Sequence, residues 1–510
     1  MTEQGLHDRL SEYCSSGIYP MHMPGHKRQM APAPDLPYER DVTELKETDD
    51  LHHADGILKE AMERTARFCH AKQTRYLVGG STCGILSAVY ASVPHEGCVI
   101  VAANCHRSVF HAIEILRAKP VLLMPEELPG NMPFPGPVSA KRVKEALSLY
   151  PEARAVIVTS PTYEGVLSDI AAIAAAVREA GKLLIVDEAH GAHLGLFETD
   201  YFGNGAVAAG ADIVIQSFHK TLPSLTQTAV LHFDPEALSA KGCMSIDHAL
   251  AVFETSSPSY PLMESIDGCT GLLIERGESL FAGWRDRLEG FYSRMKALEI
   301  LRIFTAPRGI RKDPSKIVIL TAGSGISGFG LADELAARFG FASEMAAEEY
   351  VLLMTSPADT EEALEKLAGS ILAVDHELAM GRLLKEEDGP DAQESEDGQN
   401  AGMSDPCSGI KPVRLAGLCI DIAAAQRTDE DTGLTGSRTV TVPYSEAAGL
   451  IAGEYLYRYP PGIPIVLPGE VITLETAAAL ARDHKGIRSS ATCAEGMVRC
   501  HTGGRQLYES

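Results

Sequence analysis

Two short polar segments follow apolar runs that predict β-strands, and each could contact a ligand. In GGSTCG, two glycines permit a tight turn before Ser81, Thr82 and the amide of Cys83 open a helix. Amide N–H groups at a helix N-terminus bind phosphate together with hydroxyl groups, although such a segment can also serve only as a helix cap. In AANCHRS, the imidazole of His106 could stack on a flat ring or cap its own loop.

Two further segments supply a carboxylate and an amine in the same kind of position. In DEAHGAH, Asp187 stands at the end of an apolar run, where its carboxylate could meet a ligand or cap the next turn. Glu188 should point to the opposite side, because strand side chains alternate. In QSFHKT, Ser217 and Lys220 follow another such run, and a further apolar run begins near Ala229. A lysine between two apolar runs suggests a chemical role.

Ligands of open α/β sheets bind outside the carboxyl ends of the strands, so we expect these four segments to share one crevice. Pyridoxal 5'-phosphate requires an amine for its aldehyde, a carboxylate for its ring nitrogen, a flat partner for its ring and an anion site for its phosphate. Lys220, Asp187, His106 and Ser81 with Thr82 supply one each. The sequence therefore predicts an enzyme that binds this cofactor through Lys220, whose pKa the site should lower.

A mainly parallel sheet of seven strands is expected to position these segments, because short β-branched runs alternate with helical patterns from about residue 73. The predicted strands are 76–78, 98–101, 120–124, 155–158, 183–186, 213–215 and 228–233. Between the predicted strands 155–158 and 183–186, the spacing of Ile170, Ile173 and Val177 predicts a helix that ends at Gly181. The fold class is therefore α/β.

Composition and pattern divide the remaining chain. The runs KIVILTA, LADELAARFG and YVLLMTS predict a smaller α+β domain, and the stretch after it is rich in Asp, Glu, Gly and Ser, as in flexible linkers. We expect five parts: an N-terminal arm (1–50), a cofactor-binding large domain (51–300), the small domain (301–384), the acidic linker (385–410) and a C-terminal domain (411–510).

Charge and cysteine usage narrow the possible partners. The formal net charge of −24 argues against nucleic acid and is compatible with a small cationic ligand, although a solvated acidic surface also explains it. The eleven cysteines form no C-x-x-C pair, which favours a reducing compartment. No apolar stretch approaches the roughly 18 residues of a membrane helix, and the first residues do not resemble a signal peptide. We expect a cytoplasmic protein without a membrane partner.

Two other classes of protein fit the motifs less well. VDEAH resembles the acidic motif of DEAH-type helicases, but no phosphate-binding Gly-x-x-x-x-Gly-Lys-Ser/Thr loop precedes it. A metal site could be assembled from His190 and His193 with His22 and His26, but His-x-x-His lacks the i, i+4 spacing of helical zinc sites. We therefore predict no metal.

The motifs closely resemble those of the bacterial Orn/Lys/Arg decarboxylase family over most of residues 1–300 and again over about 410–485. The resemblance implies an aspartate-aminotransferase-like fold (fold type I), pyridoxal phosphate, and a homodimer whose active sites are shared between subunits. The matching segments, in chain order, are MPGHK, DDLHHADGILKEA, GGSTCGI, NCHRS, SPTYEGV, DEAHGAH, SFHKTLPSLTQTAVLH, TSSPSYPLMESID and YPPGIPIVLPGE.

The resemblance also implies roles for individual residues. Lys220 would bind the cofactor's aldehyde, Asp187 would pair with its ring nitrogen and His106 would stack on its ring. Lys220 or His219 would return a proton to the substrate's Cα. The cofactor would be framed by these residues together with Ser81, Thr82, Cys83, Ser217 and His190.

Other implied contacts come from later segments. Thr255 or Ser256 would reach the partner subunit's site, and Glu470 would approach the distal cation of the substrate. Two departures from the family pattern, Ile85 and Arg107, place the outer phosphate contacts in question. The sequence has no flavodoxin-like leading domain of the kind found in larger members, so a dimer or tetramer is expected.

The cofactor residues alone do not determine which bond at Cα breaks. An aminotransferase or a lyase acting on another amino acid would need the same four groups, and only the resemblance selects decarboxylation. The expected reaction converts arginine, lysine or ornithine into the corresponding polyamine-type amine and CO2. Association with short family members favours arginine slightly.

Overall fold

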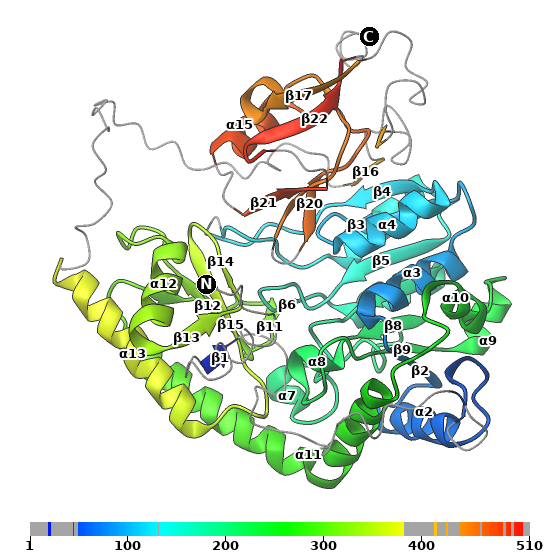
Figure 1. Ribbon diagram of the computed structural model, residues 1–510, viewed down its shortest axis with the longest axis horizontal. Coiled ribbons are helices and arrows are strands. Elements are labelled where there is room, and N and C mark those ends of the chain that lie inside the picture. Colours follow the sequence, from blue (N-terminus) through cyan, green and yellow to red (C-terminus); the bar gives the residue numbers. More distant parts are fainter. Residues whose placement is uncertain are drawn as a thin grey trace, which may run out of the picture.

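The computed structural model describes residues 19–21, 44, 49–130, 132–381, 413–415, 425–426, 438–459, 462–482, 486–490 and 494–502. Most of the predicted N-terminal arm and all of the predicted acidic linker lie outside these ranges. Figure 1 shows the large sheet in blue to green, a smaller sheet in green to yellow, and the C-terminal strands in orange and red.

The large sheet contains all seven predicted strands in the order β4-β3-β5-β7-β8-β9-β2, and β16 (Val413–Leu415) pairs antiparallel with β4 as an eighth strand that the sequence did not predict. Only β9 opposes the direction of the other six, so the predicted α/β fold with a mainly parallel sheet is confirmed. The seven are β2 (Gln73–Leu77), β3 (Cys98–Ala102), β4 (Lys119–Leu123), β5 (Ala155–Thr159), β7 (Leu183–Asp187), β8 (Ile213–Gln216) and β9 (Ala229–Phe233).

The central strands are buried along their length, as expected of parallel strands covered on both faces. One hydrophobic core joins them to α3, α4, α5, α6 and α10, and a second core joins α2 and α11 to the smaller sheet. The helices are α2 (Ile57–Phe68), α3 (Gly80–Ser92), α4 (Arg107–Leu116), α5 (Ala140–Leu149), α6 (Ile170–Glu179), α7 (Thr199–Phe202), α8 (Phe218–Thr221), α9 (Pro235–Ala240), α10 (Ile246–Phe253) and the long α11 (Tyr260–Met295), with the 3-10 turn η2 (Leu51–His53) before them.

The helix predicted from the spacing of Ile170, Ile173 and Val177 is α6, in which all three are buried. The Asp169 carboxylate accepts a hydrogen bond from Ala172 N–H and caps the helix, which ends just before Gly181.

A smaller antiparallel sheet follows α11, in the order β10-β12-β15-β14. Its outer surface is covered by α12 (Gly328–Phe339) and α13 (Glu361–Ala379), which matches the strand and helix pattern read from the sequence. A short ladder between β11 and β6 ties the segment before β12 to the large sheet's side of the molecule. The strands of the smaller sheet are β10 (Arg302–Ile303), β12 (Lys316–Leu320), β14 (Met345–Ala346) and β15 (Tyr350–Met354). Two separate pairs are formed by β6 (Val166–Leu167) with β11 (Arg311–Lys312) and by β1 (Tyr19–Met21) with β13 (Phe341–Ser343).

The C-terminal residues form two further three-stranded sheets, and residues next to the strands of the β20-β19-β21 sheet contact α4. Gly462 carbonyl accepts a hydrogen bond from Arg107 N–H, and Tyr455 hydroxyl donates to the Glu114 carboxylate at 2.9 Å. The boundaries predicted for the five parts stay predictions. The elements are β17 (Thr439–Pro443), η3 (Tyr444–Glu446), β18 (Ile451–Ala452), β19 (Leu456–Arg458), β20 (Ile463–Val466), α15 (Leu474–Arg482), β21 (Ile487–Ser489) and β22 (Met497–His501).

Candidate active site

Lys220 lies on α8, a single helical turn that follows β8 directly. The buried side chains of Phe218 and Leu222 anchor this turn to the core, so the half-buried Lys220 faces the strand ends. Its Nζ lies 2.9 Å from Nε2 of His190. Burial lowers the pKa of Lys220, while the negative charges of Asp187 and Glu344 oppose the shift.

Asp187 is the last residue of β7 and is almost fully buried. The strand predicted from the sequence covers 183–186 and so excludes Asp187. In the structure β7 includes Asp187, which pairs in register with Thr159 and Ile215 of the neighbouring strands. Ala189 N–H donates a hydrogen bond to its Oδ1 at 3.1 Å. Burial raises the pKa of Asp187, and the positive charge of Lys220 opposes this. A buried carboxylate of this kind would be stabilised by a protonated ring nitrogen.

His190 lies between the amines of two lysines. Its Nε2 contacts Lys220 and its Nδ1 lies 2.9 Å from Nζ of Lys316, a residue that the sequence analysis did not single out. The ring of Tyr163 packs edge-on against it, with 4.7 Å between the ring centroids. Burial lowers the pKa of His190 well below its usual value, so the imidazole is neutral near pH 7.

The other two histidines of the predicted site lie nearby. The charges of His106 and His219, together with those of the lysines, contribute to the lowered pKa of His190. His219 is buried, and its Nδ1 lies 2.8 Å from the Thr228 carbonyl oxygen. His106 caps α4 by accepting a hydrogen bond from Ser108 N–H at Nδ1. The structure therefore brings together five of the predicted residues: Lys220, Asp187, His190, His106 and His219.

The predicted phosphate cradle forms the first turn of α3. Gly80 has φ of +73°, a left-handed conformation that favours glycine and turns the chain from β2 into the helix. Ser81 is half-buried and Thr82 is exposed, so both hydroxyl groups are accessible to a ligand. Cys83 is buried, and its thiol points away from solvent toward a carboxylate.

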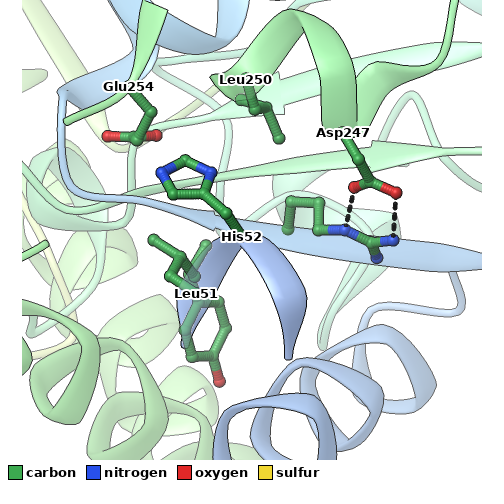
Figure 2. A pocket seen from close by; sticks show the side chains of 7 residues that line it. Leu51, His52, Asp247, Leu250 and Glu254 are labelled. Atoms are coloured by element: carbon green, nitrogen blue, oxygen red, sulfur yellow. Dashed lines mark hydrogen bonds and ion pairs between the residues drawn. The ribbon is translucent and has the colours of Figure 1, made fainter. Parts of the chain in front are cut away.

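That carboxylate belongs to Glu254, which sequence reasoning missed. Glu254 accepts hydrogen bonds from Val78 N–H at 3.2 Å and Gly79 N–H at 2.6 Å, and Cys83 Sγ lies 3.2 Å from its other oxygen. Figure 2 shows its side chain facing the imidazole of His52 in a small pocket at the edge of the large sheet. The pocket is lined by Leu51, His52, Arg75, Tyr76, Asp247, Leu250 and Glu254.

Glu254→Ala is expected to loosen the cradle, because two backbone N–H groups of its turn lose their acceptor. We expect a loss of about 1–2 kcal/mol in unfolding free energy and about a tenfold weaker affinity for pyridoxal phosphate. Thermal unfolding and an absorbance titration with the cofactor measure the two effects. Glu254→Gln, which keeps a carbonyl acceptor, is the matched control and should show the smaller change; equal affinity in all three proteins would contradict this role.

Three polar side chains near the predicted cofactor position are buried without a hydrogen-bond partner in the described structure. Ser217 Oγ and Thr221 Oγ1 flank the turn that holds Lys220, and Asn104 Oδ1 lies in the loop before His106. Burying polar atoms unpaired is costly, so these atoms are suited to a polar ligand at the ends of β3 and β8. The donor set therefore fits a phosphorylated, nitrogen-containing ring.

Two of the residues assigned by resemblance lie in other surroundings. Thr255 is exposed, and its carbonyl oxygen lies 2.8 Å from His52 Nε2. Glu470 accepts a hydrogen bond from Leu467 N–H at 3.0 Å within the C-terminal region. Their roles toward a partner subunit and a substrate stay predictions.

Other functional candidates lie near His190, Lys220 and Lys316. Tyr163 hydroxyl donates to the Glu344 carboxylate, and Asp313 Oδ2 lies 3.2 Å from Nε2 of the fully buried His193. The sequence offered one signal for this group: Lys316 stands directly beside an apolar run, IVIL.

The histidines considered for a metal have other partners. His190 contacts two lysines and His193 contacts Asp313, while His22 and His26 lie outside the described residues. Among the residues that the structure describes, no group of three or more His, Cys, Asp or Glu side chains is arranged to hold a metal ion.

The fold is α/β and aminotransferase-like, and sequence comparison gives the family of the chain. The Orn/Lys/Arg decarboxylase major domain matches residues 5–307, and the C-terminal domain of the same family matches residues 423–481. The chain belongs to the Orn/Lys/Arg decarboxylase family. It is therefore a decarboxylase, and the aminotransferase alternative is not favoured.

Two curated relatives resemble the chain over nearly their full length. The uncharacterized protein YaaO of Bacillus subtilis is 31% identical over 487 residues, which cover 94% of this chain and 93% of YaaO. Arginine decarboxylase of the same organism is 28% identical over 498 residues, covering 94% of each chain.

Solved structures share the fold at lower identity. Lysine decarboxylase A from Pseudomonas aeruginosa superposes with a TM-score of 0.67 at 19% identity, covering 90% of this chain and 74% of that one. Ureidoglycine-glyoxylate aminotransferase from Bacillus subtilis gives a TM-score of 0.51 at 18% identity over 62% of this chain and 84% of that one. Within the described residues, no helix has both the length and the apolar character needed to cross a membrane.

Proposed function

We propose that the protein decarboxylates a basic amino acid with pyridoxal 5'-phosphate, releasing CO2 and a polyamine-type amine, and that arginine is its favoured substrate. The family supports the reaction class, and a relative of matching length is named arginine decarboxylase. Lysine and ornithine are the other substrates in the family's description. The observation that most directly supports cofactor binding is the half-buried Lys220 amine, 2.9 Å from a neutral His190 and within the electrostatic influence of Asp187.

When bound, pyridoxal phosphate supplies an aldehyde that captures amines and a protonated ring that withdraws electrons from Cα. Lys220 would hold the aldehyde carbon covalently until the substrate amine replaces it. Asp187 would keep the ring nitrogen protonated, because a buried negative charge favours the cationic ring. Ser81, Thr82 and Ser217 would bind the phosphate, together with the amide of Cys83.

A proton must also reach the substrate's Cα, and Lys220 or His219 would supply it. His190 lies within hydrogen-bond distance of the Lys220 amine and would help to hold it there. Since the Thr228 carbonyl can only accept, His219 carries its proton on Nδ1 when neutral, which leaves Nε2 unprotonated. This favours Lys220 as the donor.

We further propose a cytoplasmic homodimer, or a higher homo-oligomer, with shared active sites. In it, Thr255 or Ser256 would approach the partner subunit's site and Glu470 would approach the distal cation of the substrate. The exposed position of Thr255 and Ser256 is compatible with such a contact.

The proposal is tested by incubating the purified protein with pyridoxal phosphate and arginine, lysine or ornithine in separate reactions. We expect CO2 and agmatine from arginine, with slower release of cadaverine or putrescine from the other two. If only lysine or only ornithine were decarboxylated, the proposal that arginine is the favoured substrate would be wrong. A keto acid without CO2 would overturn decarboxylation.

A further inference from the structure

Lys316 and Lys220 lie on opposite sides of one imidazole. Lys316 Nζ is 2.9 Å from His190 Nδ1, and Lys220 Nζ is 2.9 Å from His190 Nε2. Lys316 is the first residue of β12 in the small sheet, whereas His190 and Lys220 follow strands of the large sheet. The contact therefore connects the two sheets at the reactive amine.

Hydrogen-bond chemistry limits how protons are distributed over these three groups. An ammonium group donates and cannot accept, and a neutral imidazole donates from one nitrogen and accepts at the other. Burial keeps His190 neutral by lowering its pKa. The lysine that faces the imidazole N–H must therefore be a neutral acceptor, and the other lysine donates to the unprotonated ring nitrogen and can carry the charge.

The surrounding carboxylates indicate which lysine is charged. Asp313, in the same loop as Lys316, has a pKa lowered to about 2, to which His193 and Lys316 both contribute, so it is ionised near pH 7. Burial lowers the pKa of Lys220, which favours its neutral form. The ionised Asp313 acts on Lys316 and favours the charge there.

We propose that Lys316 is a positioning residue in the cofactor-free protein: its ammonium donates to Nδ1 of His190 and thereby fixes the neutral imidazole with its proton on Nε2, where that N–H holds Lys220 as an unprotonated amine ready to bind the cofactor. An unprotonated amine is the form that can attack an aldehyde. Lys316 thus acts through His190 and does not itself contact the reacting atoms.

The chain holds Lys316 rigidly in this position. Its side chain is fully buried and packs against Gly165, whose φ of +95° favours glycine and where a Cβ would lie 2.8 Å from Lys316 Cγ. The ladder of β11 with β6 fixes the preceding segment. The charged or titratable groups that act on Lys220, His190 and Lys316 from the surrounding elements are Asp187, Glu344, His106, His219, Asp313 and Glu164.

The test measures how readily Lys220 is acylated in the cofactor-free protein between pH 6 and 10. Acetic anhydride reacts only with unprotonated amines, and peptide mass spectrometry compares Lys220 with the exposed Lys144 as an internal standard. Lys316→Met should reduce the relative acylation of Lys220 at pH 7.5 about tenfold, because the midpoint of its pH profile rises by about one unit. An unchanged midpoint in a folded Lys316→Met protein would overturn the proposal.

Two controls separate positioning from simple charge repulsion. In a His190→Leu background, adding Lys316→Met should cause no further loss of acylation, whereas an equal tenfold loss there would show that the imidazole is not involved and would overturn the proposal. Lys312→Met removes a half-buried lysine of β11 whose amine donates to the backbone carbonyls of Asp313 and Lys316, and it should leave the midpoint unchanged. A shift equal to that of Lys316→Met would also overturn it.

The inference rests on the proposed role of Lys220 as the reactive amine. Acylation requires neither cofactor nor substrate. The acylation test can therefore contradict the proposed role of Lys316 even if the protein decarboxylates its substrate, and it can support that role even if no decarboxylation is found.

Discussion

Replacing Lys220 with alanine should abolish both covalent retention of pyridoxal phosphate and amine release. The variant loses the Nζ that lies 2.9 Å from His190, and the other residues of α8, which are Phe218, His219 and Thr221, carry no amine. We expect kcat to fall at least about ten-thousandfold, which corresponds to about 5.5 kcal/mol in the activation barrier. Borohydride reduction followed by peptide mapping measures retention, and CO2 release measures turnover.

The control for this prediction is Lys182→Ala. Lys182 is a lysine at the opposite end of the β7 strand, where its amine donates to the Pro151 carbonyl oxygen. The Lys182→Ala variant should keep full activity, and borohydride reduction should still attach the cofactor to the peptide that contains Lys220. If Lys220→Ala retained cofactor after reduction, or if the fixed cofactor in the parent were found on another lysine, the assignment of the reactive amine would be wrong.

Asp187→Asn should reduce kcat about a thousandfold, or about 4 kcal/mol in the activation barrier, while KM changes less than about tenfold. The amide keeps the shape of the side chain and the acceptor for Ala189 N–H, but it removes the negative charge that would keep the ring nitrogen protonated. Electron withdrawal from Cα depends on that proton, whereas substrate binding depends on other groups. Steady-state kinetics on cofactor-saturated enzyme separate the two constants.

Glu188→Gln is the matched control, since the adjacent carboxylate has a different environment. Burial raises the pKa of Glu188 to about 8, so near pH 7 it is mostly protonated and resembles the amide. It accepts hydrogen bonds from Gln216 and from Ala206 N–H. We expect nearly parental kcat. A loss in Asp187→Asn that appeared mainly as raised KM would indicate a binding role for Asp187 instead.

Local sequence patterns were sufficient to predict the large sheet and the residues at its strand ends. Parallel strands of a covered sheet are apolar throughout, so the runs that became β3, β5, β7 and β8 stood out, and the polar residues after them fell on one edge. β16 was not predicted, because a three-residue strand beyond the acidic stretch has too little pattern to recognise.

The residues that were missed act across long separations in the chain. Lys316 contacts a histidine 126 residues earlier, and Glu254 supports a turn 175 residues before it. Neither stands in a motif with local spacing, so their partners depend on how β12 and the end of α10 pack against the large sheet. Single-sequence periodicity contains no information on that packing.

The β6–β11 ladder has a consequence for how substrate enters. Arg311 pairs with Leu167 and Lys312 with Val166, and the segment joins β12 within a few residues. A hinge rotation that moved the small sheet away would have to break these pairs and withdraw Lys316 from His190. We therefore expect the entrance to open by local rearrangement of side chains and loops, with the two sheets moving as a single unit during turnover.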